Sequence, residues 1–160
     1  MIDGRPAILF CETKIETGCN FYRARQVALE MLEQDIFPCA LSRDLSDKDF
    51  EYWLDKADVI FTKVATVKLF EYLKTKPMEK KVIFDMDDNI FEVDPFNPAY
   101  EKRGVKNVDY HLPDGRIVKL RDGVDGFDID ENRANLELYA ACLRRSDLII
   151  TPSPVLSGFL

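Results

Sequence analysis

Short apolar runs alternate with longer segments of helical periodicity along most of the chain. The runs are continuously apolar and do not alternate with polar residues, which is the pattern of strands buried on both faces of a parallel sheet. They predict strands at Ala7–Cys11, Phe37–Leu41, Val59–Thr62, Lys81–Asp85 and Asp147–Thr151.

The segments that separate these runs carry apolar residues at the three- and four-residue spacing of one helix face. Ser46 followed by Asp49 resembles a helix-capping pair, which places a helix start after the second strand. The alternation of strand and helix predicts an α/β fold with a Rossmann-like, doubly wound, mostly parallel sheet of about five strands. The predicted helices cover residues 24–32, 46–54, 67–73 and 130–145.

The regular alternation fails between residues 85 and 147. A proline-rich stretch covers residues 94–98, and the turn sequence Pro113-Asp114-Gly115 lies between two arms that each favour a strand. We therefore expect a β-hairpin with arms at 105–112 and 116–120, inserted between the fourth and fifth strands of the sheet.

The last residues bear on domain organisation. Ser153 followed by Pro154 is typical of a helix N-cap and the first helical position after it. The sequence ends at Leu160, about two turns later, and a helix that short is marginal in water. We expect residues 1–160 to form one Rossmann-like domain of a longer polypeptide, with a second domain beyond residue 160. The alternative is a natural short terminal helix that docks on the sheet.

Composition limits the classes of function. The 160 residues are 46% hydrophobic and carry 22 basic against 29 acidic side chains, a formal net charge of -7. This excess of acid disfavours chain-wide binding to nucleic-acid phosphates, although a local basic patch stays open. Without a run of ~18 to 20 apolar residues or a signal-peptide pattern, we expect a soluble, cytoplasmic protein with no membrane span. Four cysteines without a C-x-x-C pair, and the single His111, imply neither a zinc site nor a disulfide framework.

Candidate chemistry lies at the predicted carboxyl ends of the strands, where open α/β sheets bind ligands. The first place is the loop and helix start after the first strand, where Arg23 and Arg25 fall in the first helical turn. Cations there oppose the helix dipole, so the pair indicates an anionic partner. That partner is either a ligand phosphate or carboxylate, or an acidic loop of this chain.

The second place is the acidic loop that follows the fourth strand, with five carboxylates within ten residues. Like charges this close need compensation, which a divalent metal, Arg23 with Arg25, or solvent can provide. The third place comprises hydroxyl groups and a lysine that can bind substrate oxygens, although capping is the preferred role for Ser153. The carboxylates are Asp85, Asp87, Asp88, Glu92 and Asp94, and the third set is Thr62, Lys63, Thr151 and Ser153.

Three stretches carry a family resemblance. They are G-C-N-F-Y-R after the first strand, V-I-F-D-M-D-D-N-I-F at the fourth, and S-D-L-I-I-T-P-S-P-V-L at the fifth. In this order, along residues 7–160, they resemble the amino-terminal domain of glycosyltransferases with the GT-B architecture. The resemblance is to the family 4-like group found in bacteria and phages.

The resemblance implies transfer of a sugar, in a cleft between two facing Rossmann-like domains, from a nucleotide-sugar donor to an acceptor, a carbohydrate or another hydroxyl compound. The donor is a co-substrate, and no tightly bound cofactor or metal is implied. This chain corresponds to the acceptor side, and because the carboxyl-terminal donor domain is absent, we expect the 160 residues alone to be inactive. By position, Gly18, Asn20, Tyr22 and Arg23 would line the acceptor side, Asp85, Asp87 and Asp88 would form the bordering loop, and Thr151 and Ser153 would lie near the crossing to the second domain.

Two other functions stay open. The stretch V-I-F-D-M-D-D-N also resembles the first motif of haloacid-dehalogenase-type phosphatases, in which Asp85 would be the nucleophile, Asp87 the acid/base, and both would bind Mg²⁺. That motif normally continues with Gly-Thr, where this chain has Asp88-Asn89. The third hypothesis is a non-catalytic Rossmann-like module that binds a partner.

Overall fold

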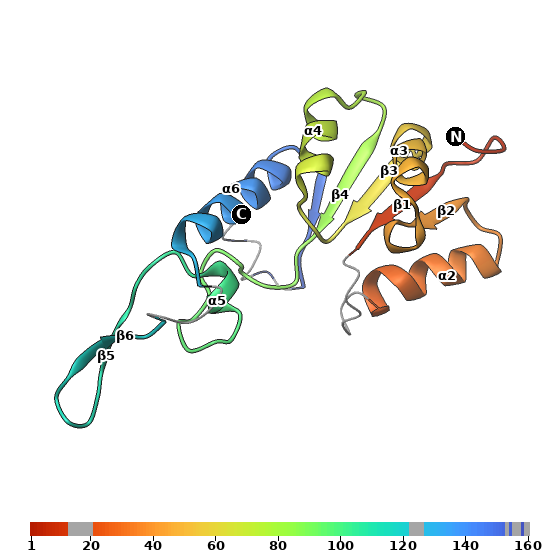
Figure 1. Ribbon diagram of the computed structural model, residues 1–160. Helices are drawn as coiled ribbons and strands as arrows, with labels where there is room; N and C mark the ends of the chain where they lie inside the picture. Colours follow the sequence, from red (N-terminus) through yellow and green to blue (C-terminus); the bar gives the residue numbers. More distant parts are fainter. Residues whose placement is uncertain (13–20, 122–126, 153, 155–157, 159–160) are drawn as a thin grey trace. The chain divides into compact units, whose positions relative to one another are not determined.

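The computed structural model describes every residue except 13–20, 122–126, 153, 155–157 and 159–160 (Figure 1). By its internal contacts the chain divides into two compact units. Unit 1 consists of Met1–Asp87 and Ala141–Leu160, and unit 2 is Asp88–Ala140. Unit 2 therefore contains the region for which the sequence predicts a hairpin.

Unit 1 is built on a parallel β-sheet (Figure 1). In the described part of the chain five strands pair in the order β2-β1-β3-β4-β7, and every pairing is parallel. The predicted fold class, a Rossmann-like α/β sheet, is confirmed. The strands are β1 Ile8–Cys11, β2 Cys39–Leu41, β3 Val59–Thr62, β4 Lys81–Asp85 and β7 Leu148–Ile150.

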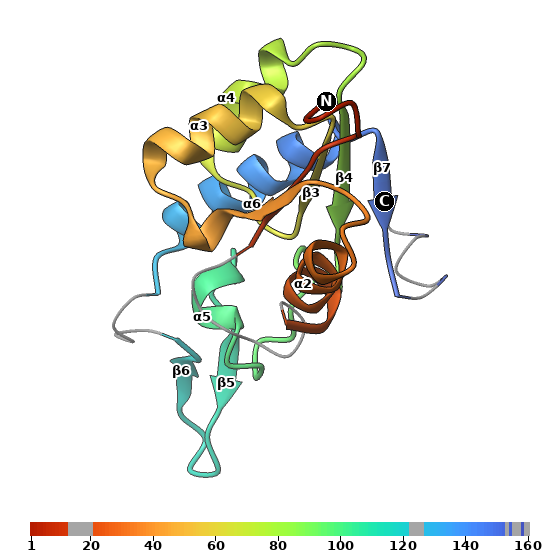
Figure 2. The same cartoon turned by 90° about the vertical axis from the view of Figure 1, so that its right-hand side faces the viewer.

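Helices cover both faces of this sheet, with α2 on one face and α3 and α4 on the other (Figure 2). The predicted cap at Ser46 is confirmed, because its Oγ accepts a hydrogen bond from the Asp49 N–H at 3.2 Å. The first helix departs from the prediction in that a π-helical turn, η1, precedes α2. None of the described helices has the length and apolar character that crossing a membrane requires. The elements are η1 Phe21–Arg25, α2 Gln26–Glu33, the 3₁₀ turn η2 Ser42–Asp44, α3 Asp47–Lys56 and α4 Val67–Thr75.

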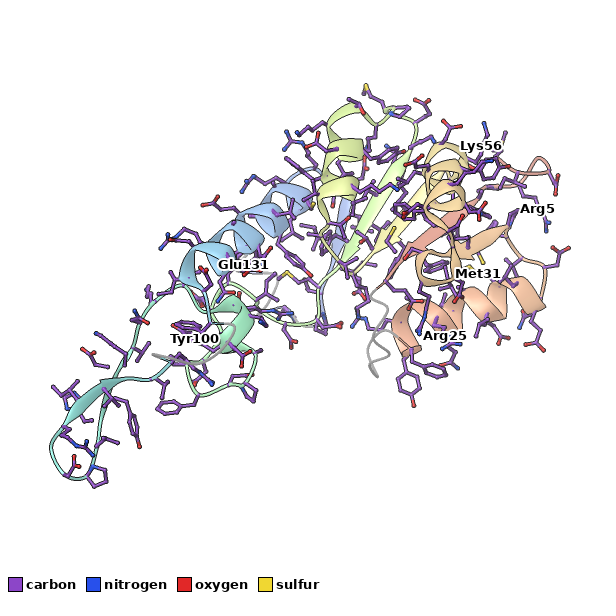
Figure 3. The ribbon with its side chains drawn as sticks, in the orientation of Figure 1. Arg5, Arg25, Met31, Lys56, Tyr100 and Glu131 are labelled. Carbon is purple, nitrogen blue, oxygen red and sulfur yellow. The ribbon has the colours of Figure 1, made fainter. Side chains whose placement is uncertain are left out.

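Successive side chains of a strand point to opposite faces, so the sheet supports two cores. On the α2 face, buried Phe10 and Leu41 pack with Ala28 of α2. Phe61 packs against them, as does Met31, which Figure 3 labels. The residues that alternate with these on the strands are buried on the opposite face. They are Leu9, Ile60, Val82 and Phe84.

At the amino edge of the sheet an aspartate precedes each of two strands and ties it to its neighbour. Asp58 accepts a hydrogen bond from the Ala7 N–H at 2.9 Å, and Asp147 accepts one from the Val82 N–H at 2.8 Å. The bond from Ala7 holds the pKa of Asp58 below its ordinary value. For Asp147, partial burial raises the pKa. The hydrogen bond from the Val82 N–H and the Lys76 ammonium lower it by a larger amount, so the pKa lies below its ordinary value. These aspartates stabilise the sheet at the edge opposite the site described below.

Unit 2 packs around Tyr100. The Tyr100 ring is buried, stacks on Phe127 with ring centroids 6.1 Å apart, and its hydroxyl donates to the Lys106 carbonyl at 2.8 Å. The side-chain amide of Asn132, 2% exposed, donates to the Gly104 carbonyl at 3.0 Å. The elements are α5 Tyr100–Arg103, β5 Asp109–His111, β6 Ile117–Lys119 and α6 Ile129–Leu143, whose last residues belong to unit 1.

The predicted hairpin is present but shorter than expected. Its antiparallel pairing covers only residues 109–111 and 117–119, and the side chains of both strands are exposed. His111 lies on this exposed hairpin. Two short strands without a buried face make few packing contacts, which explains why the pairing does not extend to the full predicted arms.

Candidate functional site

Four charged side chains gather at the carboxyl edge of the sheet in unit 1. Strand β1 lies between β2 and β3. The chain first adds β2 on one side of β1, and then adds β3, β4 and β7 on the other side, so the direction in which strands are added reverses at β1. Such a reversal is the topological switch point at which doubly wound folds bind their ligands. Arg23 comes from η1, Lys63 follows β3, and Asp85 and Asp87 come from the end of β4 and the residues after it; we call these four the ion cluster.

The strand register turns Asp85 toward α2. Ile83, two residues earlier, pairs with Phe61, whose side chain packs on the α2 face of the sheet. Asp85 has the same orientation because side chains alternate along a strand. The guanidinium of Arg23, at the start of the helix on this face, binds both carboxylate oxygens: Nε donates to Oδ2 at 2.8 Å and Nη2 donates to Oδ1. This bidentate geometry is the strongest form of an ion pair between these two side chains.

Lys63 and Asp87 complete the ion cluster. The Lys63 ammonium donates to Asp87 Oδ2 at 2.5 Å and lies 3.4 Å from Asp85 Oδ2. Arg23 Nη1 lies 3.0 Å from Asp87 Oδ1. Each cation therefore contacts both carboxylates, and the formal charge of the four groups sums to zero.

Burial differs across the ion cluster. The side chains of Asp85 and Lys63 are 1% and 6% exposed, whereas those of Asp87 and Arg23 are 20% and 31% exposed. A buried charge is tolerated only when it is paired and hydrogen-bonded, and the geometry meets that condition. Asp87 thus presents a hydrogen-bond acceptor to the surface, and Arg23 presents a donor. Both are held in place by their contacts with the buried side chains of Asp85 and Lys63.

The ion cluster shows how two of the five carboxylates after β4 are compensated. The sequence leaves a metal, Arg23 with Arg25, and solvent open; the structure assigns Asp85 and Asp87 to Arg23 and to Lys63. Among the described residues no three acidic, histidine or cysteine side chains form a group that could hold a metal ion. Arg25 is half-buried at the carboxyl end of η1.

The other predicted site residues lie in different surroundings. Thr62 is fully buried, and its hydroxyl donates to the Val64 carbonyl at 2.7 Å, which closes a local turn. Tyr22 is 67% exposed, and Thr151 is half-buried at the end of β7. Asp88 is exposed and belongs to unit 2. Gly18, Asn20 and Ser153 lie outside the described residues.

Sequence reasoning missed one buried acid at this edge. Glu12 directly follows β1, its side chain is 0% exposed, and its Oε1 lies 3.9 Å from Arg43 Nε. Its backbone N–H donates to Ser42 Oγ at 3.0 Å, which joins the ends of β1 and β2. A charged residue directly after a buried strand is the signal that could have identified it.

The thiol at the end of β1 is unsuited to nucleophilic chemistry. Cys11 ends β1 and is buried, and burial raises its pKa to about 12. Because the thiolate is the nucleophile, a thiol with that pKa is almost entirely inert near neutral pH. Cys11 therefore acts as a small apolar side chain in the core.

The carboxyl edge thus offers hydrogen-bond donors and acceptors in a fixed arrangement without a buried net charge. Carboxylates accept from hydroxyl groups, and guanidinium and ammonium groups donate to them. Comparison with known proteins found no family model and no curated protein that matches this chain.

Proposed function

We propose that this chain is the acceptor-side domain of a nucleotide-sugar-dependent glycosyltransferase of the GT-B architecture. The observation that carries the proposal is the charge-neutral ion cluster at the switch point of a Rossmann-like sheet. It supports the resemblance of the stretches around Arg23 and Asp85 to that family.

A neutral ion cluster suits an uncharged ligand rich in hydroxyl groups. A carbohydrate acceptor offers neighbouring hydroxyls that can donate to Asp87 and accept from Arg23 without changing the charge balance of the site. The buried Asp85–Arg23 pair fixes the guanidinium before the ligand arrives, which reduces the ordering cost of binding.

The proposal includes a second, donor-binding domain as partner and a nucleotide sugar as co-substrate. In enzymes of this architecture helix dipoles and basic side chains can stabilise the departing diphosphate, so no tightly bound metal is required. We place the reaction in the cytoplasm, since Cys11, Cys39 and Cys142 are free thiols.

The phosphatase alternative receives less support from the same contacts. A nucleophilic carboxylate needs an oxygen directed at the substrate, but Arg23 binds both oxygens of Asp85. The Lys63 ammonium lies between Asp85 and Asp87, in the place where a shared Mg²⁺ would have to bind. The chemistry of these contacts favours a binding role for both aspartates.

Two measurements test the proposal. The polypeptide encoded by the complete reading frame is assayed for release of nucleoside diphosphate from a panel of nucleotide sugars, with methyl glycosides as acceptors. The 160-residue chain is titrated with the same glycosides by NMR. We expect turnover in the first assay, and in the second glycoside binding that Asp87→Asn weakens about tenfold, because a charge-assisted hydrogen bond is lost.

Asp44→Asn is the matched control, because Asp44 is exposed on η2. It should leave glycoside binding unchanged. Absence of nucleotide-sugar turnover by the complete polypeptide, together with no glycoside binding by the chain, would overturn the proposal and favour the non-catalytic module. Magnesium-dependent phosphatase activity lost in Asp85→Asn would favour the phosphatase.

A further inference from the structure

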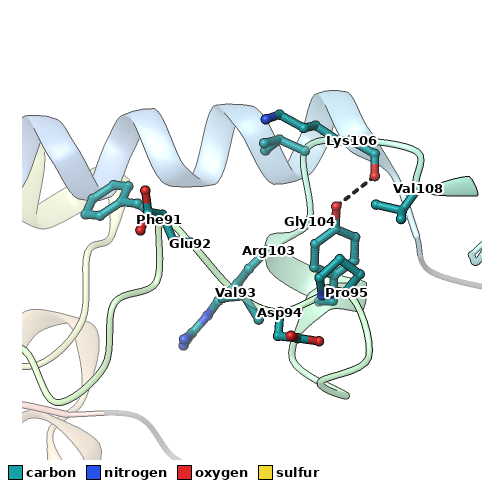
Figure 4. A pocket seen from close by; sticks show the side chains of 11 residues that line it. Phe91, Glu92, Val93, Asp94, Pro95, Arg103, Gly104, Lys106 and Val108 are labelled. Atoms are coloured by element: carbon teal, nitrogen blue, oxygen red, sulfur yellow. Dashed lines mark hydrogen bonds between the residues drawn. The ribbon is translucent and has the colours of Figure 1, made fainter.

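Unit 2 contains a pocket of about 380 Å³ between the segment after β4 and the segment that begins with α5 (Figure 4). This volume is in the range of small-molecule sites. Apolar and polar atoms contribute about equally to the wall, and four charged side chains line it. The apolar lining comes from Phe91, Val93, Pro95, Tyr100, Val105 and Val108, and the charged lining from Glu92, Asp94, Arg103 and Lys106.

The apolar wall is held in place by the core of unit 2. The Tyr100 ring is fixed by its stacking on Phe127 and by its hydrogen bond to the Lys106 carbonyl, which Figure 4 draws as a dashed line. Gly104 packs so tightly on this ring that a Cβ there would overlap it. The wall is therefore preformed and does not have to assemble around a ligand.

The charged groups of the pocket differ in whether they have partners. Asp94 Oδ1 accepts from the Phe96 N–H at 2.8 Å, and Glu92 Oε2 accepts from the Asn89 amide at 3.3 Å. Among the described residues, the side chain of Arg103 has no hydrogen-bond or ion-pair partner although it is half-buried. In Figure 4 it extends past Val93. Lys106 is exposed and, in the described part of the chain, also has no such side-chain partner. The pocket thus combines an apolar wall around Tyr100 with a half-buried guanidinium that can pair with a ligand.

We propose that this pocket binds a small aromatic carboxylate, with the ring against the apolar wall and the carboxylate on Arg103. A guanidinium and a carboxylate are both planar and pair through two parallel hydrogen bonds. A phosphate dianion fits less well, because Glu92 and Asp94 already offset the charges of Arg103 and Lys106, so the second negative charge of the ligand would have no compensation. The site lies wholly in unit 2 and is independent of the glycosyltransferase proposal.

The test uses three probes with the same ring: indole-3-acetate, indole-3-acetamide and indol-3-yl phosphate. Each is titrated into the ¹⁵N-labelled 160-residue chain, and amide chemical shifts report both site and affinity. We expect indole-3-acetate to bind with a Kd of roughly 1 mM and to shift amides within residues 91–108. The amide should bind at least about tenfold more weakly, and the phosphate more weakly than the carboxylate.

Arg103→Gln keeps a polar side chain and removes the cation. We expect it to abolish the preference for acetate over acetamide while leaving the Tm of the chain unchanged. Lys102→Gln, an equal charge change at the exposed neighbour on α5, should keep that preference. The proposal is overturned if indole-3-acetate shifts no amide of residues 91–108 at millimolar concentration, or if Arg103→Gln keeps the preference.

Discussion

Replacing Asp85 by asparagine removes one of the two negative charges of the ion cluster and keeps the size of the side chain. The cluster then changes from a formal charge of zero to +1, with Lys63 still only 6% exposed. Breaking a buried ion pair from one side costs about 3–5 kcal/mol. Here Asp87 stays 2.5 Å from Lys63 and 3.0 Å from Arg23, and solvent reaches Arg23, so part of that cost is offset. We expect a loss of ~2 kcal/mol in the free energy of unfolding.

For a chain of this length that loss lowers the Tm by about 6 °C. Urea unfolding followed by circular dichroism gives the free energy, and Asp88→Asn, at an exposed position, is the control. A second substitution, Lys63→Gln, restores neutrality, so Asp85→Asn with Lys63→Gln should be destabilised by ~1 kcal/mol less than the sum of the single variants. An Asp85→Asn chain within ~0.5 kcal/mol of the natural chain, or no coupling in the double variant, would refute the reasoning.

Three further results follow from the packing. The lowered pKa of Asp147 stabilises the fold above the ordinary carboxyl pKa of about 3.9, and this stabilisation is lost as pH falls through the folded-state pKa. Asp147→Asn should therefore reduce the urea midpoint more at pH 7 than at pH 3, and equal reductions would contradict this. Because burial raises the pKa of Cys11 to about 12, mass spectrometry after iodoacetamide at pH 8 should find Cys11 unmodified until urea is added. Gly104→Ala should destabilise the chain by ~1–3 kcal/mol in thermal unfolding, because the added Cβ would overlap the Tyr100 ring. Any residue can adopt the φ of -72° found at this position, so the loss would come from the overlap and not from backbone strain. A Tm equal to that of the natural chain would show that the ring can move aside.

Local patterns in the sequence were sufficient for the strands of unit 1 and for the start of α3, but not for the short turns η1 and η2. Strands β3 and β4 lie at the predicted residues, and the helix start at Ser46 is where the capping pair indicates. These features depend on neighbours within a few residues, which a periodicity or a cap reveals directly. The same reasoning did not find α5, because residues 100–103 form a single turn that depends on the packing of Tyr100.

The order of residues alone shows that several carboxylates follow β4 and that arginines stand at the start of the first helix. Which of these charges meet depends on the fold. Arg23 and Asp85 are 62 positions apart, and the partners of Asp87 include Lys63, which the sequence suggested only as a ligand for substrate oxygens. The strand order places the ends of β1, β3 and β4 side by side, and the register turns Asp85 to the α2 face. Ion pairing depends on distance in space, and with 22 basic side chains in the chain only the fold selects the two that lie within reach.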